Sequence, residues 1–305
     1  MKFLRFVLLA ACLATLLPAL PAHAARLRVV ATVPTLAQLA REVAGADADV
    51  EALLAPNQDP HYADAKPSLV IALNRADLLL FNGLDLEVGW LPALVRQARN
   101  AKLLPGAAGS FDASRWVQKL RVPASVDRAQ GDIHPGGNPH FSWDPRAGAA
   151  VAEGLGTALG QLDPEHAAAF RQRGATLAQQ LRALAGQERQ KFAALTPAQR
   201  QVAVYHDSLV YLLDWLGLQQ VATIEPRPGI PPDPAHLARV VGQLKAAHVA
   251  ALLQEEYYPR NASDQVARLT GARLVVLQAG PRDRTDYVSY VRGLAAEIYA
   301  VQSSK

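Results

Sequence analysis

The chain has 305 residues, half of them apolar, which is enough for the core of one large domain or two modest ones. Lys2 and Arg5 carry part of the formal net charge of +4, so removal of residues 1–24 would leave a nearly neutral protein. This balance gives no reason to expect nucleic acid or an anionic membrane as a partner, and no later stretch reaches the ~20 apolar residues of a membrane span.

Residues 1–24 have the parts of a secretory signal peptide. Two basic residues precede an apolar run, and the run ends in an A-x-A pattern that predicts cleavage after Ala24. The alternative is a lipoprotein anchor at Cys12, which ends a short lipobox-like sequence. The mature chain is therefore expected in the periplasm. It would contain no cysteine, so neither a disulfide nor a thiolate ligand is available.

Short apolar strands alternate with amphipathic helices in the first part of the mature chain. Strands are expected at 27–33, 50–55 and 77–83, and 102–106 is a candidate for a fourth. Helices are expected at 35–45, 66–76 and 87–99. This alternation predicts a parallel sheet that is covered by helices on both faces.

A long helix should follow the first sheet. Between Asp163 and Ala194 the only proline is Pro164, which lies at the start, and no later proline interrupts the helical pattern. A helix of roughly thirty residues, rising ~1.5 Å per residue, could span a whole domain. Flexible Gly/Ser linkers are not seen here, so the connection should be stiff.

The last third of the chain repeats the order of the first. Strands are expected at 202–206, 220–225, 249–256 and 273–279, with helices at 208–217, 234–248, 261–271 and from about 284 onward. The fold class is therefore α/β, with two similar lobes, each a parallel sheet flanked by helices, joined by one long rigid helix. The expected divisions are 1–24 signal peptide, 25–150 N-terminal lobe, 151–198 connecting helices and 199–305 C-terminal lobe.

Three histidines stand where ligands bind in such folds, beyond the carboxyl ends of the strands. His61 and His206 follow predicted strands, and His140 lies in the loop GGNPHFSWDP that ends the first lobe. Any one of them alone could be a hydrogen-bonded core or turn histidine. Together they would form a site for a divalent ion such as zinc, copper, iron or nickel. Zinc usually takes four ligands, and Glu255 or water would supply the fourth.

Two carboxylates lie near these histidines in sequence. Asp59 precedes His61, and Asp144 follows His140. Each could accept a hydrogen bond from the ring of a metal-bound histidine, although turn formation and helix capping are the commoner roles. Three other histidines lie in or beside helices and are expected at the surface: His166, His236 and His248.

Several motifs resemble the metal-binding receptors of bacterial ABC importers for zinc and manganese. They are DPHYADAKPS at 59–68, NPHFSWDP at 138–145 and VYHDSLVYLLDWLGL at 204–218. The resemblance covers the whole mature chain. It implies a non-catalytic, monomeric receptor that binds a divalent metal through His61, His140 and His206. It also implies delivery of that metal to an ABC permease in the inner membrane.

The chain departs from this family at the expected fourth ligand. Family members usually have an aspartate at the end of the last strand, where this chain has Gln278, and a neutral amide is a poor zinc ligand. The fourth contact could come from Glu255, Glu256 or solvent. Asp283 and Asp286 are nearby but belong to the start of the last helix.

The choice of metal follows from the ligand types. The His-rich loop of many zinc receptors is reduced here to a segment with only His134 before His140, so a flexible histidine arm is not expected. Three histidines favour zinc, with manganese as the other option, and affinity should fall as the pH drops through ~6.5. A zinc hydrolase, or an adhesin or metal chaperone on the same scaffold, is the alternative function. No HExxH motif and no nucleophile with a partnered base supports the enzyme.

Overall fold

The computed structural model describes residues 26–64, 66–125, 134–227, 229–282 and 285–304. The predicted signal peptide, the lipoprotein alternative at Cys12 and Asp283 lie outside these residues. Among the helices within them, none is both long and apolar enough to cross a membrane.

The first lobe contains a four-stranded parallel sheet. Its strands lie in the order β2-β1-β3-β4, and their bounds are β1 Leu27–Ala31, β2 Ala48–Ala52, β3 Leu78–Phe81 and β4 Ser110–Asp112. Its helices are α2 Pro34–Ala44, α3 Pro67–Arg75 and α4 Leu91–Ala98. Each of these helices has a proline in its first turn, where the missing backbone N–H costs nothing.

The fourth strand of the first sheet is not where the sequence suggested. The expected strand at 102–106 is wrong, because Ala101–Leu103 forms a 3₁₀ turn in which Asn100 accepts a hydrogen bond from the Lys102 backbone. Pro105 and Gly106 then prevent a continuous strand. Pairing with β3 begins only at Ser110.

The second lobe has the same connectivity as the first. Its strand order is β6-β5-β7-β8, again all parallel, with bounds β5 Gln201–Val204, β6 Gln219–Thr223, β7 Ala251–Glu255 and β8 Arg273–Leu277. The helices are α7 Val210–Leu216, α8 Pro234–Ala246, α9 Asn261–Thr270 and α10 Tyr287–Gln302. The prediction of two similar α/β lobes is confirmed.

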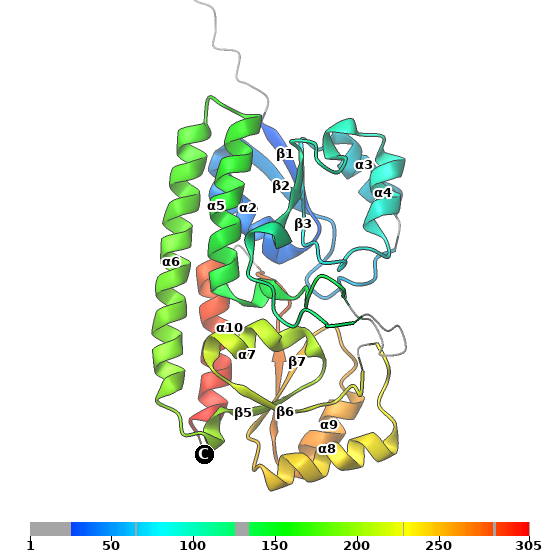
Figure 1. The fold of residues 1–305 in the computed structure, drawn as a ribbon, viewed down its shortest axis with the longest axis vertical. Coiled ribbons are helices and arrows are strands. Elements are labelled where there is room, and N and C mark those ends of the chain that lie inside the picture. The colour runs from blue at the N-terminus through cyan, green and yellow to red at the C-terminus, as the bar shows by residue number, and fades with distance from the viewer. Residues whose placement is uncertain (1–25, 65, 126–133, 228, 283–284, 305) are drawn as a thin grey trace, which may run out of the picture.

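Two long helices connect the lobes. Helices α5 (Pro145–Leu162) and α6 (Ala167–Ala193) lie side by side along one flank, and α6 extends beside both sheets (Figure 1). Near one end of α6, Arg173 donates to the carbonyls of Val43 and Ala44 in the first lobe. Near its other end, Arg189 donates to the carbonyl of Asp214 in the second lobe. The predicted long connecting helix is thus present and is bound to both lobes.

Close contact between α5 and α6 depends on glycines. A Cβ atom added at Gly174 would lie 2.6 Å from the Ala152 carbonyl oxygen, and one at Gly156 would lie 2.8 Å from the Phe170 carbonyl oxygen. Both obstacles are backbone atoms, which cannot rotate away. The two helices can therefore approach this closely only without side chains at these positions.

We expect Gly174→Ala to lower the free energy of unfolding by about 1–3 kcal/mol, because it would force the backbones of α5 and α6 apart. Gly186→Ala in the same helix is the matched control, since nothing lies within 4 Å of a Cβ there. That change should stabilise the protein by about 0.5–1 kcal/mol through helix propensity. Urea unfolding followed by circular dichroism would measure both. Equal effects of the two substitutions would contradict the packing argument.

Candidate metal centre

The three predicted histidines meet at the junction of the two lobes. The ring centroids of His61 and His140 are 5.0 Å apart, and the His206 ring lies 5.9 Å from His61 and 5.7 Å from His140. His61 comes from the loop after β2 and His206 from the residues after β5. The carboxyl ends of both sheets therefore face one another, as the rule for ligand sites in open α/β sheets predicts.

A fourth histidine, His134, joins the group. Its ring centroid is 5.5 Å from that of His61 and 6.3 Å from that of His140. One ligand atom each from His61, His134 and His140 lies within 4.8 Å of the others, a spacing from which a metal ion could be held. From the sequence His134 was expected only as a loop residue, and its place in this group was not predicted.

His61 is oriented by its own loop. Its Nδ1 lies 2.7 Å from Asp59 Oδ1, and the Pro60 carbonyl accepts a hydrogen bond of 3.0 Å from Trp90 Nε1. Burial acts to raise the pKa of Asp59, but the hydrogen bonds from His61 outweigh it and the pKa lies below its usual value. Asp59 thus stays ionised and favours the imidazole tautomer in which Nε2 could bind a metal ion. Asp59 Oδ1 also accepts a hydrogen bond of 3.0 Å from the backbone N–H of His61, so Asp59 both forms the turn and contacts the ring.

His206 has a carboxylate partner that the sequence analysis did not identify. Its Nδ1 lies 2.6 Å from Glu225 Oε2, and both side chains are buried. Glu225 follows β6, which pairs directly with β5, so the two strand ends are neighbours. The Glu225 contact fixes the ring in the same way as Asp59 fixes His61, so that Nε2 is the ring nitrogen that could bind a metal ion.

His140 is held by its backbone. Its side chain is deeply buried, at 4% exposure, and its N–H donates to the Asn138 side chain. The preceding carbonyl, of Pro139, accepts from Asn82, whose backbone N–H binds the buried carboxylate of Glu87. Burial lowers the pKa of His140 well below its usual value, and the nearby imidazoles act in the same direction. The ring is therefore neutral, the form that binds metal.

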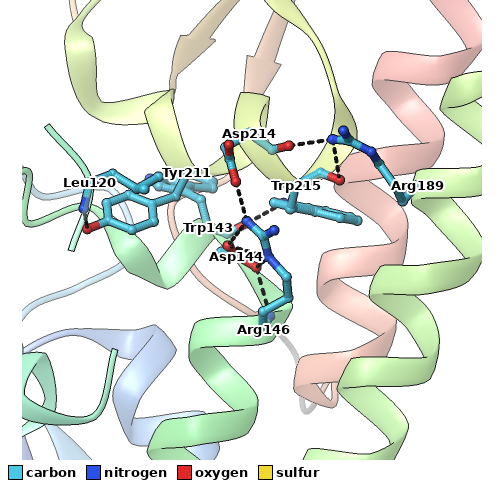
Figure 2. A network of polar contacts seen from close by, with 8 residues as sticks. All are labelled: Leu120, Trp143, Asp144, Arg146, Arg189, Tyr211, Asp214 and Trp215. Carbon is cyan, nitrogen blue, oxygen red and sulfur yellow. Dashed lines mark hydrogen bonds and ion pairs between the residues drawn. The ribbon is translucent and has the colours of Figure 1, made fainter. Parts of the chain in front are cut away.

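The loop that carries His140 is also bound to the second lobe. The Tyr211 hydroxyl on α7 donates to the carbonyl of Asn138 and accepts from the backbone N–H of Leu120, at 3.0 and 2.9 Å. Trp215 Nε1, one turn later on α7, donates to the Trp143 carbonyl at 3.0 Å (Figure 2). Residues on both sides of His140 are thus tied to the helix that follows His206.

A charged network continues this connection. Asp144 caps α5 and binds the Arg146 guanidinium through both carboxylate oxygens, and Arg146 also binds Asp214 on α7 at 2.6 Å (Figure 2). Burial raises the pKa of Asp144, and Arg146 offsets this only in part. Asp144 therefore has the capping role rather than a contact to His140.

Glu255, the predicted fourth ligand, is fully buried at the end of β7. Ser208 Oγ donates to one of its carboxylate oxygens, while the other has no hydrogen-bond partner among the described residues. Burial, followed by the charges of Asp59 and Glu225, raises the pKa of Glu255 to about 8. The group at neutral pH is thus mainly protonated, and a ligand role would require loss of that proton.

The other fourth-ligand candidates have different partners. Glu256 accepts from the backbone of Ala279 and pairs with Arg282. The Gln278 side chain is exposed, and Asp286 caps α10. None of them is directed by these contacts towards the histidines.

Solvent reaches the site from the first lobe. A cavity of about 500 Å³ is lined by His61 together with Asp59, Tyr62, Asp64 and Trp90. His61 is thus both a wall of this cavity and a member of the histidine group, and an incoming cation would meet carboxylates first.

Two α/β lobes joined by a long helix, with imidazoles from both lobes facing one another, define a metal-binding solute receptor. The chain belongs to the family described as the periplasmic zinc-uptake complex component A, ZnuA, whose model matches residues 29–301. The protein is accordingly an extracytoplasmic solute-binding component of an ABC uptake system, and it binds rather than transforms its solute.

Individual relatives differ in the metal for which they are named. The zinc-binding protein TroA of Treponema pallidum is 28% identical over 258 residues, 83% of this chain and 77% of that protein. The iron-binding protein YfeA of Yersinia pestis is 23% identical over 253 residues, 82% of this chain and 76% of that protein. A crystal structure of ZnuA superposes with a TM-score of 0.77 at 21% identity, covering 91% of this chain and 100% of that one.

Proposed function

We propose that this receptor captures zinc in the periplasm and delivers it to an ABC permease in the inner membrane. The observation that carries the proposal is the meeting of His61, His140 and His206 from two lobes, with carboxylates on the Nδ1 atoms of two of them. Imidazole ligands of this kind suit zinc better than manganese, which prefers oxygen. The relative named for iron makes ferrous iron the main competitor.

The ion would bridge the lobes. In this proposal residues 25–150 and 199–305 act as two lobes connected by 151–198, and cleavage after Ala24 releases a monomer. His61 comes from the first lobe and His206 from the second, so an ion that binds both stabilises the closed arrangement by its greater affinity for it. The contacts of α6 with both lobes keep the movement small. Docking on the permease then separates the lobes and releases the ion.

Titration of the metal-free protein with zinc, manganese and, under anaerobic conditions, ferrous iron tests the choice of metal. We expect one zinc per chain and a zinc affinity at least a hundredfold above that for manganese, which is about 2.7 kcal/mol. Elemental analysis of protein isolated from its own compartment is the companion measurement. Manganese or iron binding as tight as zinc binding would refute zinc as the cargo, and failure to bind any of the three would refute the site.

A further inference from the structure

We propose that His134 is the fourth metal ligand, so that the ion is held by four imidazoles and no carboxylate. This inference rests on the proposed function, because it concerns the same site. It begins from the geometry: His134, His61 and His140 present ligand atoms within 4.8 Å of one another. Zinc–nitrogen bonds of about 2.1 Å place tetrahedral ligand atoms closer than this, so the rings would need to move inward by an ångström or so.

A tight turn places His134 beside His140. The carbonyl of His134 accepts a hydrogen bond of 3.1 Å from the backbone N–H of Gly137, with Pro135 in the position that favours such a turn. The chain thus reverses between two histidines that are six residues apart in sequence. Gly137 has a φ of +115°, which few other residues adopt.

The end of this turn is attached to both lobes. The Asn138 backbone N–H donates to the Leu120 carbonyl at 2.9 Å, and its side chain donates to the Asp207 carbonyl at 2.7 Å. Asp207 directly follows His206. The turn therefore has a fixed distance to the second lobe, and His134 is held near the rings of His61 and His140 instead of lying on a free arm.

The carboxylates that could compete for the fourth position do not belong to the ligand-atom group of His61, His134 and His140 found among the described residues. Glu256 is bound by Arg282 and a backbone N–H, and one carboxylate oxygen of Glu255 is bound by Ser208. Gln278 is exposed and carries no charge. Among the described residues, His134 is the further side chain whose ligand atom lies within 4.8 Å of those of two proposed ligands, His61 and His140.

A four-imidazole sphere has a chemical consequence. Four nitrogen ligands satisfy the tetrahedral preference of zinc, whereas manganese favours carboxylate, carbonyl and water oxygens. Use of His134 in place of a strand-end carboxylate would thus increase selectivity for zinc. The selectivity would depend on a residue outside the two sheets.

X-ray absorption spectroscopy of the zinc-loaded full chain, combined with competition titration, tests the proposal. We expect four imidazoles at the zinc in the parent and three in His134→Ala. The substitution should lower zinc affinity by about 10–100-fold and manganese affinity much less, so that the preference for zinc shrinks. His248→Ala is the matched control. His248 is exposed and comes after α8, far from residues 134–140 in the sequence, so its replacement should change neither the affinity nor the number of imidazoles at the zinc.

The outcomes separate this inference from the proposed function. If the parent binds zinc through three imidazoles and His134→Ala leaves both affinity and coordination unchanged, His134 is not a ligand, while the receptor function stands. If the parent binds no zinc, both proposals fail. Circular dichroism of His134→Ala should match the parent, because the side chain lies in a loop at the edge of the site.

Discussion

Zinc affinity is expected to fall on the order of a thousandfold, or about 4 kcal/mol, when His140 is replaced by alanine. His140 is the most enclosed of the histidines, and its ring lies 5.0 Å from that of His61, 6.3 Å from that of His134 and 5.7 Å from that of His206. Its loss removes a neutral, buried imidazole that lies beside the other three rings. Removal of a residue that is hydrogen-bonded to a metal ligand typically lowers metal affinity by about 10–100-fold. Loss of the ligand itself should therefore lower the affinity further.

The matched control for His140→Ala is His236→Ala. His236 lies on α8, where its ring contacts the Thr223 carbonyl and takes no part in the histidine group. Calorimetric titration in competition with a chelator of known affinity would measure parent and variants on one scale. Parent-like zinc binding by His140→Ala would show that the buried ring has a structural role only.

The placement of the three predicted ligands could be derived from the sequence for a simple reason. The strands are short and regularly separated by helices, so the carboxyl ends of those that were correctly predicted can be located to within about three residues. His61 and His206 follow two of these ends, in β2 and β5. Parallel strands bring all such ends to one edge of each sheet, and the rings of His61 and His206, 5.9 Å apart, show that the two edges meet.

His134 was beyond the reach of the same reasoning, and Glu225 was overlooked by it. His134 depends on a turn that reverses the chain, and sequence spacing alone does not say which way a glycine-rich loop folds. Glu225 becomes a partner of His206 because β6 lies next to β5 in the sheet. The order of strands in a sheet cannot be read from their order along the chain. A full inventory of strand ends would have included Glu225, since it follows β6 as His206 follows β5.

The fourth strand illustrates a different limit. Residues 102–106 are apolar enough for a strand, but Leu103 is buried from within a 3₁₀ turn. A short apolar run indicates that a segment is buried, but it does not indicate whether the backbone is a strand or a helical turn. The observed β4 contains Phe111 between two polar residues and gives a weaker signal than the segment before it.

Replacing Arg146 by methionine is expected to lower the free energy of unfolding by about 3 kcal/mol. Arg146 binds Asp144 through both carboxylate oxygens, and the Asp144 side chain is only 4% exposed. Removal of the guanidinium leaves a buried carboxylate with a backbone N–H as its remaining hydrogen-bond donor, which is the costly way to break an ion pair. Asp214 would lose the same partner, and with it one connection between α5 and α7.

Arg182→Met is the matched control for Arg146→Met. Arg182 makes an equally short bidentate pair with Glu153, at 2.7 Å for both contacts, but both side chains are largely exposed. Its removal should cost about 0–1 kcal/mol, as for other surface pairs. Urea unfolding of both variants gives the comparison, and equal losses would contradict the role of burial. Arg146 connects Asp144, four residues after His140, to Asp214 on α7, the helix that follows His206. Zinc affinity should therefore also fall, by about tenfold, in Arg146→Met and not in Arg182→Met.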